Sequence, residues 1–316
     1  MFSKLAVEMI ARPVGAAQIF GRCIAAAALA FLVIAAPARA QSPETIEVVD
    51  VAGRTVKVKH GVQRAILGEG RLFYGTVVLD KDKPFSQIAA IGNDFKTFDP
   101  DTWDKYLARF PETKNVPQIG ALIAADFSVE QAISLNADVV IASLGSYPKA
   151  METGIVEKLE KAGIPTVFID FRERTVQNTV PSMLLLGRIF AKEAQAQAYV
   201  DTYTKAMQQV YTKLVNRKES ERPLVFVERA AGLDPGVCCL TFGPTNFGEF
   251  VAIAGGVNWG SRFFAGLGGQ VNPEKVIVDN PAYYLLTGAN WSNSNPGNTA
   301  VWLGYATDPA KAQEQL

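Results

Sequence analysis

Histidine and cysteine are scarce in this sequence, and their scarcity argues against several kinds of site. The 316 residues contain one histidine, His60, and three cysteines. Zn²⁺ and Mn²⁺ sites usually draw on several imidazole or thiolate ligands, so one histidine argues against capture of a bare transition-metal ion. It also argues against a Ser-His-Asp triad, which needs a histidine beside its nucleophile. We therefore expect neither a resident metal nor a resident cofactor.

Motifs of catalysis and of dinucleotide binding are also missing. No Gly-x-Ser-x-Gly sequence is present. Gly68-Glu69-Gly70 opens like a dinucleotide fingerprint, but Phe73 stands where the third glycine is required. Basic and acidic residues are equal in number, 31 of each, so no basic excess points to nucleic acid. We expect no enzyme, although an exported Rossmann-like enzyme stays open as the main alternative from another class.

Cys238 and Cys239 are adjacent, which leaves two interpretations open. In an oxidising compartment they would form a vicinal disulfide. Alternatively both act as small, largely buried residues with unpaired thiols. The second interpretation is favoured, and in neither case do two adjacent cysteines make a disulfide framework.

Residues 1–40 have the layout of an export signal. Basic residues precede an apolar run of fourteen residues, Cys23–Ala36, and Ala38-Arg39-Ala40 has the small-x-small pattern that signal peptidase cleaves. The run is short for a bilayer span, which takes about 20 apolar residues. Arg22 before Cys23 argues against lipid attachment. We expect a cleaved signal peptide and a mature protein that is free in the periplasm.

The remaining sequence is long enough for two small domains. Its 276 residues carry 27 basic and 30 acidic side chains, a net charge of −3. Apolar runs alternate with helical patterns over residues 45–175, which predicts an α/β lobe with a parallel sheet. Residues 176–218 predict connecting helices, with Lys192–Lys218 as one helix of about 40 Å. The α/β pattern resumes over residues 222–316.

The predicted fold is therefore two Rossmann-like lobes with parallel sheets, joined by one long helix, in a monomer. Thr45–Val58 alternates and predicts a hairpin. A helix is predicted near Phe247–Ala254. The other predicted strands are Arg64–Leu67, Ile88–Ile91, Val139–Ala142, Thr166–Ile169, Leu224–Val227 and Tyr283–Leu286.

Two stretches that lie 144 residues apart match position by position. Ser128-Val129-Glu130-Gln131-Ala132-Ile133 corresponds to Asn272-Pro273-Glu274-Lys275-Val276-Ile277, and each begins with a good helix N-cap residue. A glutamate in the first turn of a helix gains about 0.3–1 kcal/mol from the helix dipole. That gain explains one such glutamate, but it does not explain the same position in both lobes. The lobes are therefore expected to be structural duplicates.

Several segments match a known family in order and spacing. They are Asp50–Val56, Ser128–Glu130 with Asp138–Ile141, Gly163–Pro165, Ala254–Asn258, and Asn272–Glu274 with Asn280–Pro281. Over about residues 45–290 the chain resembles the periplasmic binding proteins of ABC importers for iron-siderophore complexes, haem and vitamin B12.

The resemblance implies a function and two docking residues. In that family a ligand binds between two lobes, and a glutamate on each lobe pairs with arginines of the permease. The matching residues here are Glu130 and Glu274. The implied function is capture of a ferric siderophore and its delivery to an ABC permease at the inner membrane. Haem or cobalamin binding by the same fold, and a non-transport sensor module, stay open as alternatives.

One feature departs from the family near the C-terminus. The family continues with a further strand and closing helices after the stretch 280–288, whereas this sequence stops at Leu316. We therefore expect the second lobe, residues 222–316, to be incomplete.

Candidate ligand-binding residues come from the loops that follow strands, because open parallel sheets bind ligands beyond the carboxyl ends of their strands. Arginine suits carboxylate-bearing ferric chelates through bidentate hydrogen bonds, and aromatic rings offer flat apolar walls. Arg229 and Trp291 lead because each closely follows a predicted strand. The full set is Arg229, Trp291, Arg71, Glu69, Tyr147 and Arg172.

Overall fold

The computed structural model describes residues 45–234, 236, 238–289, 291, 295, 297 and 299–301. The predicted signal peptide, including Cys23, lies outside these residues, as do residues 302–316. All of the described residues belong to one compact unit, and both lobes described below are parts of it.

The predicted hairpin is confirmed as an antiparallel pair, β1 (Thr45–Val49) and β2 (Thr55–Lys59). Its residues alternate between exposed and buried, so one face packs against the first lobe. The turn is held by the buried carboxylate of Asp50, whose Oδ1 accepts hydrogen bonds from the backbone N–H groups of Ala52 and Arg54, both at 3.0 Å.

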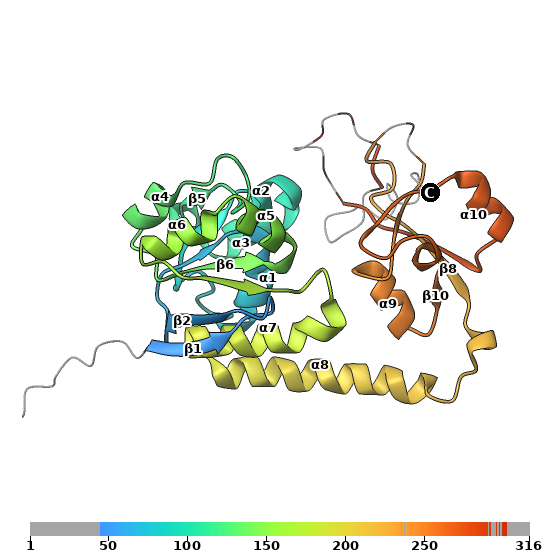
Figure 1. Ribbon diagram of the computed structural model, residues 1–316, viewed down its shortest axis with the longest axis horizontal. Coiled ribbons are helices and arrows are strands. Elements are labelled where there is room, and N and C mark those ends of the chain that lie inside the picture. Colours follow the sequence, from blue (N-terminus) through green and yellow to red (C-terminus); the bar gives the residue numbers. More distant parts are fainter. Residues whose placement is uncertain are drawn as a thin grey trace, which may run out of the picture. The chain divides into compact units, whose positions relative to one another are not determined.

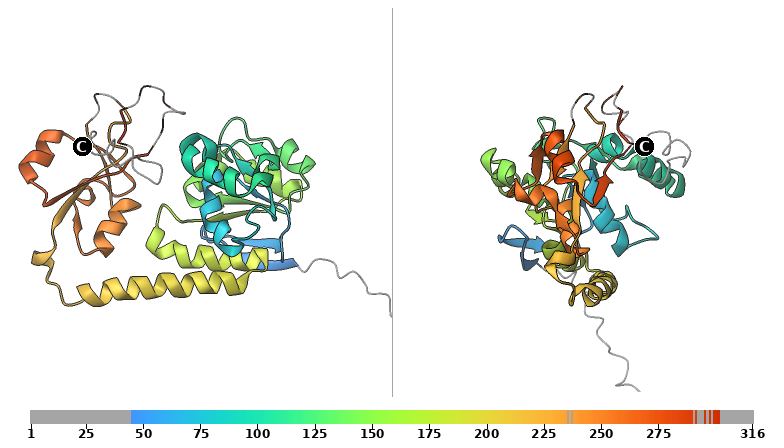
Figure 2. Two further views of the ribbon diagram at one scale, coloured as in Figure 1. Left: turned by 180° about the vertical axis from the view of Figure 1, so that it is seen from behind. Right: turned by 90° about the vertical axis from the view of Figure 1, so that its right-hand side faces the viewer.

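The first lobe is coloured blue to green in Figures 1 and 2. Its sheet is parallel throughout, in the order β5-β4-β3-β6-β7. Its central strands are apolar at nearly every position because helices cover both faces. β5 was not predicted, since two residues make no recognisable apolar run. The strands are β3 (Ala65–Leu67), β4 (Ile88–Gly92), β5 (Gln118–Ile119), β6 (Val139–Ser143) and β7 (Thr166–Ile169).

Successive strand residues contribute to two cores, one on each face of this sheet. Ile141 packs in the core that the hairpin and α7 (Thr175–Phe190) also line. Its neighbour Val140 packs in the core beneath α4 (Val129–Ser134), α5 (Tyr147–Glu152) and α6 (Ile155–Lys161). The remaining helical segments of the lobe are η1 (Gly70–Leu72), α1 (Phe73–Thr76), η2 (Val77–Leu79), α2 (Asp94–Phe98), α3 (Pro100–Arg109), η3 (Pro111–Asn115) and η4 (Leu144–Ser146).

A pair of packed helices follows the first sheet. α7 leads into α8 (Glu193–Leu214), a helix of 22 residues and about 33 Å. α8 starts one residue later and ends four residues earlier than the predicted helix. A Cβ atom on Gly187 of α7 would lie 2.4 Å from Cβ of Ala196, so glycine is required where the two helices touch.

The sheet of the second lobe is mixed, which the sequence did not predict. β8 pairs in parallel with β10 and β12, but β9 runs antiparallel to both β8 and β11. The α/β class is confirmed, whereas this sheet does not duplicate the first. The elements are η5 (Glu219–Glu221), β8 (Leu224–Glu228), β9 (Leu240–Phe242), α9 (Phe247–Ile253), β10 (Val257–Asn258), η6 (Trp259–Arg262), β11 (Gly268–Gln270), α10 (Pro273–Asp279) and β12 (Tyr283–Leu286).

The structure joins Cys238 and Cys239 as a vicinal disulfide, so the favoured interpretation as unpaired thiols is wrong. Cys239 is buried and Cys238 is exposed.

Among the described residues, no helix combines the length and the apolar character that a membrane crossing requires.

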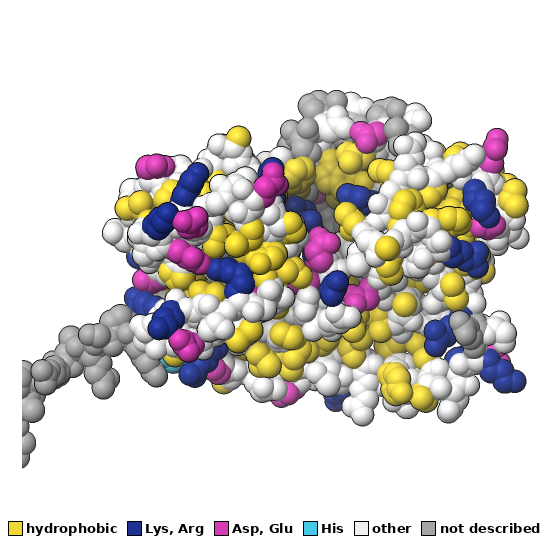
Figure 3. All heavy atoms as spheres, in the orientation of Figure 1, with side chains coloured by type: hydrophobic (Ala, Val, Ile, Leu, Met, Phe, Trp, Pro, Cys, Tyr) yellow, Lys and Arg dark blue, Asp and Glu magenta, His cyan; other side chains and the backbone are white. Residues whose placement is uncertain are grey.

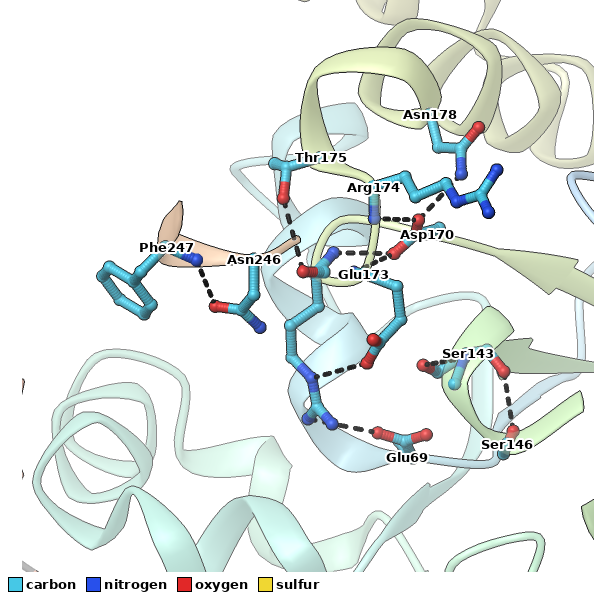
Figure 4. A network of polar contacts seen from close by, with 12 residues as sticks. Glu69, Ser143, Ser146, Asp170, Glu173, Arg174, Thr175, Asn178, Asn246 and Phe247 are labelled. Atoms are coloured by element: carbon cyan, nitrogen blue, oxygen red, sulfur yellow. Dashed lines mark hydrogen bonds and ion pairs between the residues drawn. The ribbon is translucent and has the colours of Figure 1, made fainter. Parts of the chain in front are cut away.

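The turn from β7 into α7 is organised by one buried carboxylate, that of Asp170. It accepts hydrogen bonds from the backbone N–H groups of Arg172, Glu173 and Arg174 and from the side-chain amide of Asn178, at 2.7–2.8 Å (Figure 4). Asp170 is 1% exposed. Four part-buried donors therefore share this one carboxylate as their acceptor.

We expect Asp170→Ala to lower the free energy of unfolding by about 3 kcal/mol, since it removes four hydrogen bonds that each contribute about 0.5–1.5 kcal/mol. Asp170→Asn keeps one oxygen acceptor and should lose less. Urea denaturation measures both changes. The control is Asp201→Ala on the exposed side of α8, which should change stability by less than about 0.5 kcal/mol. Equal stability of Asp170→Ala and the control would contradict this account.

Candidate functional site

A cavity of about 480 Å³ lies at the carboxyl ends of β3, β6 and β7. This is the edge at which parallel sheets usually bind ligands, and the volume is within the range of small-molecule sites, about 300–1,000 Å³. The lining comes from the strand-end loops, from α7 and α8, and from one residue of α9. It consists of Glu69, Arg71, Leu72, Tyr74, Gly75, Ser143, Phe171, Arg172, Thr175, Thr179, Met183, Tyr199, Tyr203 and Phe250.

Arg71, Arg172 and Glu69 are the charged residues in the lining of the cavity. Arg71 Nε donates to Asp94 Oδ2 at 3.0 Å, and the same carboxylate accepts from Gly70 N. Arg172 is held more loosely, with its guanidinium 3.9 Å from Glu69 Oε2 and 3.8 Å from Glu173 Oε1. Because the side chain of Arg172 is half exposed and its ion pairs are long, its guanidinium is free to accept a ligand anion in their place.

The surroundings of Glu69 disfavour its negatively charged form. Burial raises the pKa of the Glu69 carboxyl, and the nearby carboxylate of Asp94 raises it further. Arg172, Arg71 and a hydrogen bond from Ser143 act in the opposite direction, but burial is the largest influence. The surrounding residues therefore compensate the charge of Glu69 incompletely. A positively charged or hydrogen-bond-donating ligand group would relieve it.

Aromatic side chains make the other walls. Tyr199 and Tyr203 stack along one face of α8, with ring centroids 6.3 Å apart and planes 12° from parallel. Burial raises the pKa of both phenols, and burial together with the carboxylate of Asp99 raises that of Tyr74. These hydroxyls therefore stay protonated near neutral pH. The cavity offers neutral hydroxyl groups and flat apolar surface beside the guanidinium of Arg172.

Comparison with known proteins decides the family. Residues 87–298 match the model of a family described as periplasmic binding protein. This chain belongs to that family. A search of curated proteins found no match to the sequence.

Solved structures agree with this assignment. The TroA-like periplasmic binding protein FepB of Veillonella parvula is 25% identical, over 86% of this chain and 77% of its own, with a TM-score of 0.75. Molybdate-bound MolA of Haemophilus influenzae is 18% identical, over 76% and 73% of the two chains, with a TM-score of 0.60. BauB, bound to ferric iron and two acinetobactin molecules, is 20% identical, over 78% and 77%, with a TM-score of 0.54. The last two likenesses show the fold alone.

Three of the predicted ligand-binding residues line the cavity of this binding protein, namely Glu69, Arg71 and Arg172. The other three lie elsewhere. Tyr147 packs edge-on against Phe168, with centroids 5.0 Å apart, and so contributes to a core of the first lobe.

Arg229 and Trp291, the leading candidates, are not among the lining residues. The guanidinium of Arg229 lies 5.8 Å from the ring centroid of Phe242, on the second sheet. Trp291 is half-buried, and its backbone oxygen accepts from Asn295 N at 2.9 Å. Their roles in ligand binding stay predictions.

The lining residues that sequence reasoning missed are mainly helical. Thr179 and Met183 on α7, and Tyr199 and Tyr203 on α8, are each spaced four residues apart, so each pair shares a helix face. The aromatic pair was a usable signal, because two tyrosines on one face of a connecting helix offer a stacking surface. Phe250 carried no such signal.

A second hollow, of about 860 Å³, runs along the C-terminal half of α8 and the end of α9. It is wide and mostly apolar, and Arg222 is the one charged side chain in its described lining. Although it is larger, it lies away from the strand ends and gathers no set of polar groups. The smaller cavity is therefore the better candidate for a specific ligand.

One group of potential metal ligands occurs among the described residues. Donor atoms of Glu228, Cys238 and Cys239 lie within 4.8 Å of one another. The two sulfurs are bonded to each other, and Glu228 already accepts a hydrogen bond from the hydroxyl of Tyr284. This arrangement offers no free thiolate to a metal ion.

The two predicted docking glutamates occupy equivalent exposed positions. Glu130 is the second residue of α4, and Glu274 is the second residue of α10. Ser128 and Asn272 cap these helices through their side-chain oxygens. The backbone N–H of Glu130 and the Ser128 hydroxyl hold the pKa of the Glu130 carboxyl below its usual range.

We expect Glu69→Gln to raise the melting temperature at pH 7–8. Since burial raises the pKa of Glu69, its ionised form is less stable in the folded protein than in the unfolded chain. The penalty is absent below the pKa of an unfolded glutamate, about 4.3, and grows as the pH rises through the folded pKa. The gain should therefore disappear as the pH falls towards 4.

Thermal unfolding followed by circular dichroism between pH 4 and pH 8 checks this dependence. Glu130→Gln is the matched control, because the pKa of Glu130 is lowered and its substitution should give no gain. A pH-independent difference for Glu69→Gln would show that the carboxylate is well compensated.

Proposed function

We propose that this protein is the solute-binding subunit of an ABC importer, and that it captures a ferric siderophore or a related iron complex in the cavity at the strand ends. The observation that carries the proposal is the loosely paired guanidinium of Arg172 beside a wall of tyrosines. A ligand carboxylate can replace the long contacts of Arg172 with a bidentate hydrogen bond, and a ligand ring can pack against the tyrosines.

The fold does not select the ligand, because similar folds hold different cargoes. MolA carries molybdate and BauB carries a ferric siderophore. The lining of the cavity therefore has to discriminate. Two arginines favour an anionic chelate, and the absence of histidine from the described lining disfavours a haem held by an axial imidazole. Cobalamin binding remains the second possibility for the same cavity.

Delivery is proposed to follow the route of the family. Residues 1–40 serve as a cleaved signal peptide, so the mature protein is a free periplasmic monomer and not a lipoprotein. It carries its ligand to a permease in the inner membrane. Glu130 and Glu274 are exposed on equivalent helices, which suits two carboxylates that orient the protein by pairing with permease arginines. It acts as a stoichiometric carrier and not as an enzyme.

We expect intrinsic fluorescence of residues 41–316 to respond saturably to one iron complex. The probes are ferric citrate, a ferric tris-catecholate, haem, cyanocobalamin and zinc chloride, and Trp103, Trp259, Trp291 and Trp302 report on binding. Arg172→Ala should weaken the affinity about tenfold or more, since a charge-assisted hydrogen bond contributes about 1.5–3 kcal/mol.

Arg188→Ala is the control, because Arg188 is an exposed arginine of α7 that pairs with Glu193 outside the cavity. It should leave the affinity unchanged. Equal weakening by both substitutions would point to a general charge effect. Stronger binding of haem or cobalamin would replace the iron-siderophore proposal, and product formation from any probe would favour an enzyme.

The docking role gives a separate prediction. The double variant Glu130→Ala/Glu274→Ala should abolish ligand uptake through the importer while its ligand affinity stays at the wild-type value. Uptake by vesicles that contain the importer, together with a fluorescence titration, separates the two effects. A loss of ligand affinity would place these glutamates in the ligand site, and unchanged uptake would remove them from the docking surface.

A further inference from the structure

The two helices that carry the docking glutamates share more than the glutamate. Each places a small or apolar residue inward two positions later, Ala132 in α4 and Val276 in α10, both buried. Each then places an isoleucine outward at the next position. Ile133 is 49% exposed and Ile277 is 76% exposed.

Glutamate and isoleucine are three residues apart, so they lie on the same side of their helix. Three residues advance the helix by about 4.5 Å and rotate it to within about 60° of the starting direction. The two side chains are therefore neighbours on the surface. Figure 3 shows both acidic and apolar side chains on the surface over α4 and over α10.

Local folding does not explain these isoleucines. A single exposed apolar residue is common on protein surfaces, but isoleucine is a weaker helix former than leucine, lysine or glutamate because its branched side chain loses rotamer freedom. Neither isoleucine is needed for the core, since the neighbouring Ala132 and Val276 point inward. The same outward pair nevertheless occurs in both lobes, although the sheets that support the two helices differ.

We propose that each docking helix presents the permease with a two-part contact, a carboxylate and an isoleucine one turn later. This inference rests on the proposed function and names the surface of its partner. The partner surface carries, in two places, a basic side chain beside an apolar depression. Once the isoleucine fills that depression, water is excluded from the neighbouring ion pair, and the ion pair contributes more to affinity than it would in solvent.

The two contacts are not identical. In α10, Val278 is also 77% exposed and lies four residues after Glu274, so it widens the apolar surface beside the carboxylate. Lys275 is occupied by Asp279, with Nζ 2.6 Å from Oδ1. In α4 the corresponding residue is Ser134, and the nearby charge of Lys158 acts on Glu130. The first-lobe contact should therefore depend on salt more than the second-lobe contact.

The test is affinity for the importer of the source organism, purified and reconstituted in nanodiscs. The variant is Ile133→Thr/Ile277→Thr, because threonine keeps the branched Cβ and alters the helix little while it removes apolar surface. We expect at least a tenfold loss of affinity for the importer and unchanged ligand affinity. Val49→Thr is the matched control, since Val49 is 66% exposed on the edge of β1, outside both docking helices.

The outcomes separate this inference from the proposed function. If the isoleucine variant binds the importer like the wild type while Glu130→Ala/Glu274→Ala does not, the carboxylates act alone and the inference is wrong, but the docking role stands. If the glutamate variant also binds like the wild type, both docking assignments are wrong. If Val49→Thr weakens binding as much as the isoleucine variant, the effect is not specific to the docking helices and the inference fails.

Discussion

The carboxylate of Asp170 is the constraint on which the candidate site depends. It accepts hydrogen bonds from three consecutive backbone N–H groups and one side-chain amide, and so fixes the turn between β7 and α7. The turn positions the backbone of Arg172 beside the cavity and sets the direction of α7. α7 in turn packs against α8 through Gly187 and Ala196, and so determines where the two tyrosines of α8 lie. One buried anion thus couples the charged end of the cavity to its aromatic wall.

The cavity itself holds a charge balance that a ligand can change. Arg71 is closely paired with Asp94, whereas Arg172 makes only long contacts, and burial raises the pKa of Glu69. A ligand anion that binds Arg172 replaces the long ion pair between Arg172 and Glu69. A hydrogen-bond donor of the ligand can then bind the Glu69 carboxylate. An iron chelate with both carboxylate and hydroxyl or amide groups meets both requirements. A purely apolar ligand meets neither and leaves the buried charge uncompensated.

The sequence predicts this fold best where burial alone shapes the pattern. Buried parallel strands are apolar on both faces, so β3, β4, β6 and β7 appear as continuous runs. β9 and β11 are three residues each, and Gly268-Gly269-Gln270 has no apolar run to recognise, so tertiary pairing sets them. The same difference explains the site. Glu69, Arg71 and Arg172 follow strands of an all-parallel sheet, where the strand-end rule holds. Arg229 follows β8, which pairs in parallel with β10 and β12 but whose last residue, Glu228, pairs with the antiparallel strand β9. Tyr199 and Tyr203 reach the cavity only through the packing of α7 against α8.

The lobes agree least in their sheets and most in α4 and α10, and this contrast bears on why the two helices look alike. A helix that served only its own lobe would follow the differences between a five-stranded parallel sheet and a five-stranded mixed sheet. Instead the cap, the exposed glutamate, the buried anchor and the exposed isoleucine recur at the same four positions. The capping residue and the anchor are what any short helix needs. The exposed glutamate gains only about 0.3–1 kcal/mol from the helix dipole, and the exposed isoleucine lies outside both cores. The repetition of the pair is therefore better explained by a surface outside the protein that both helices fit.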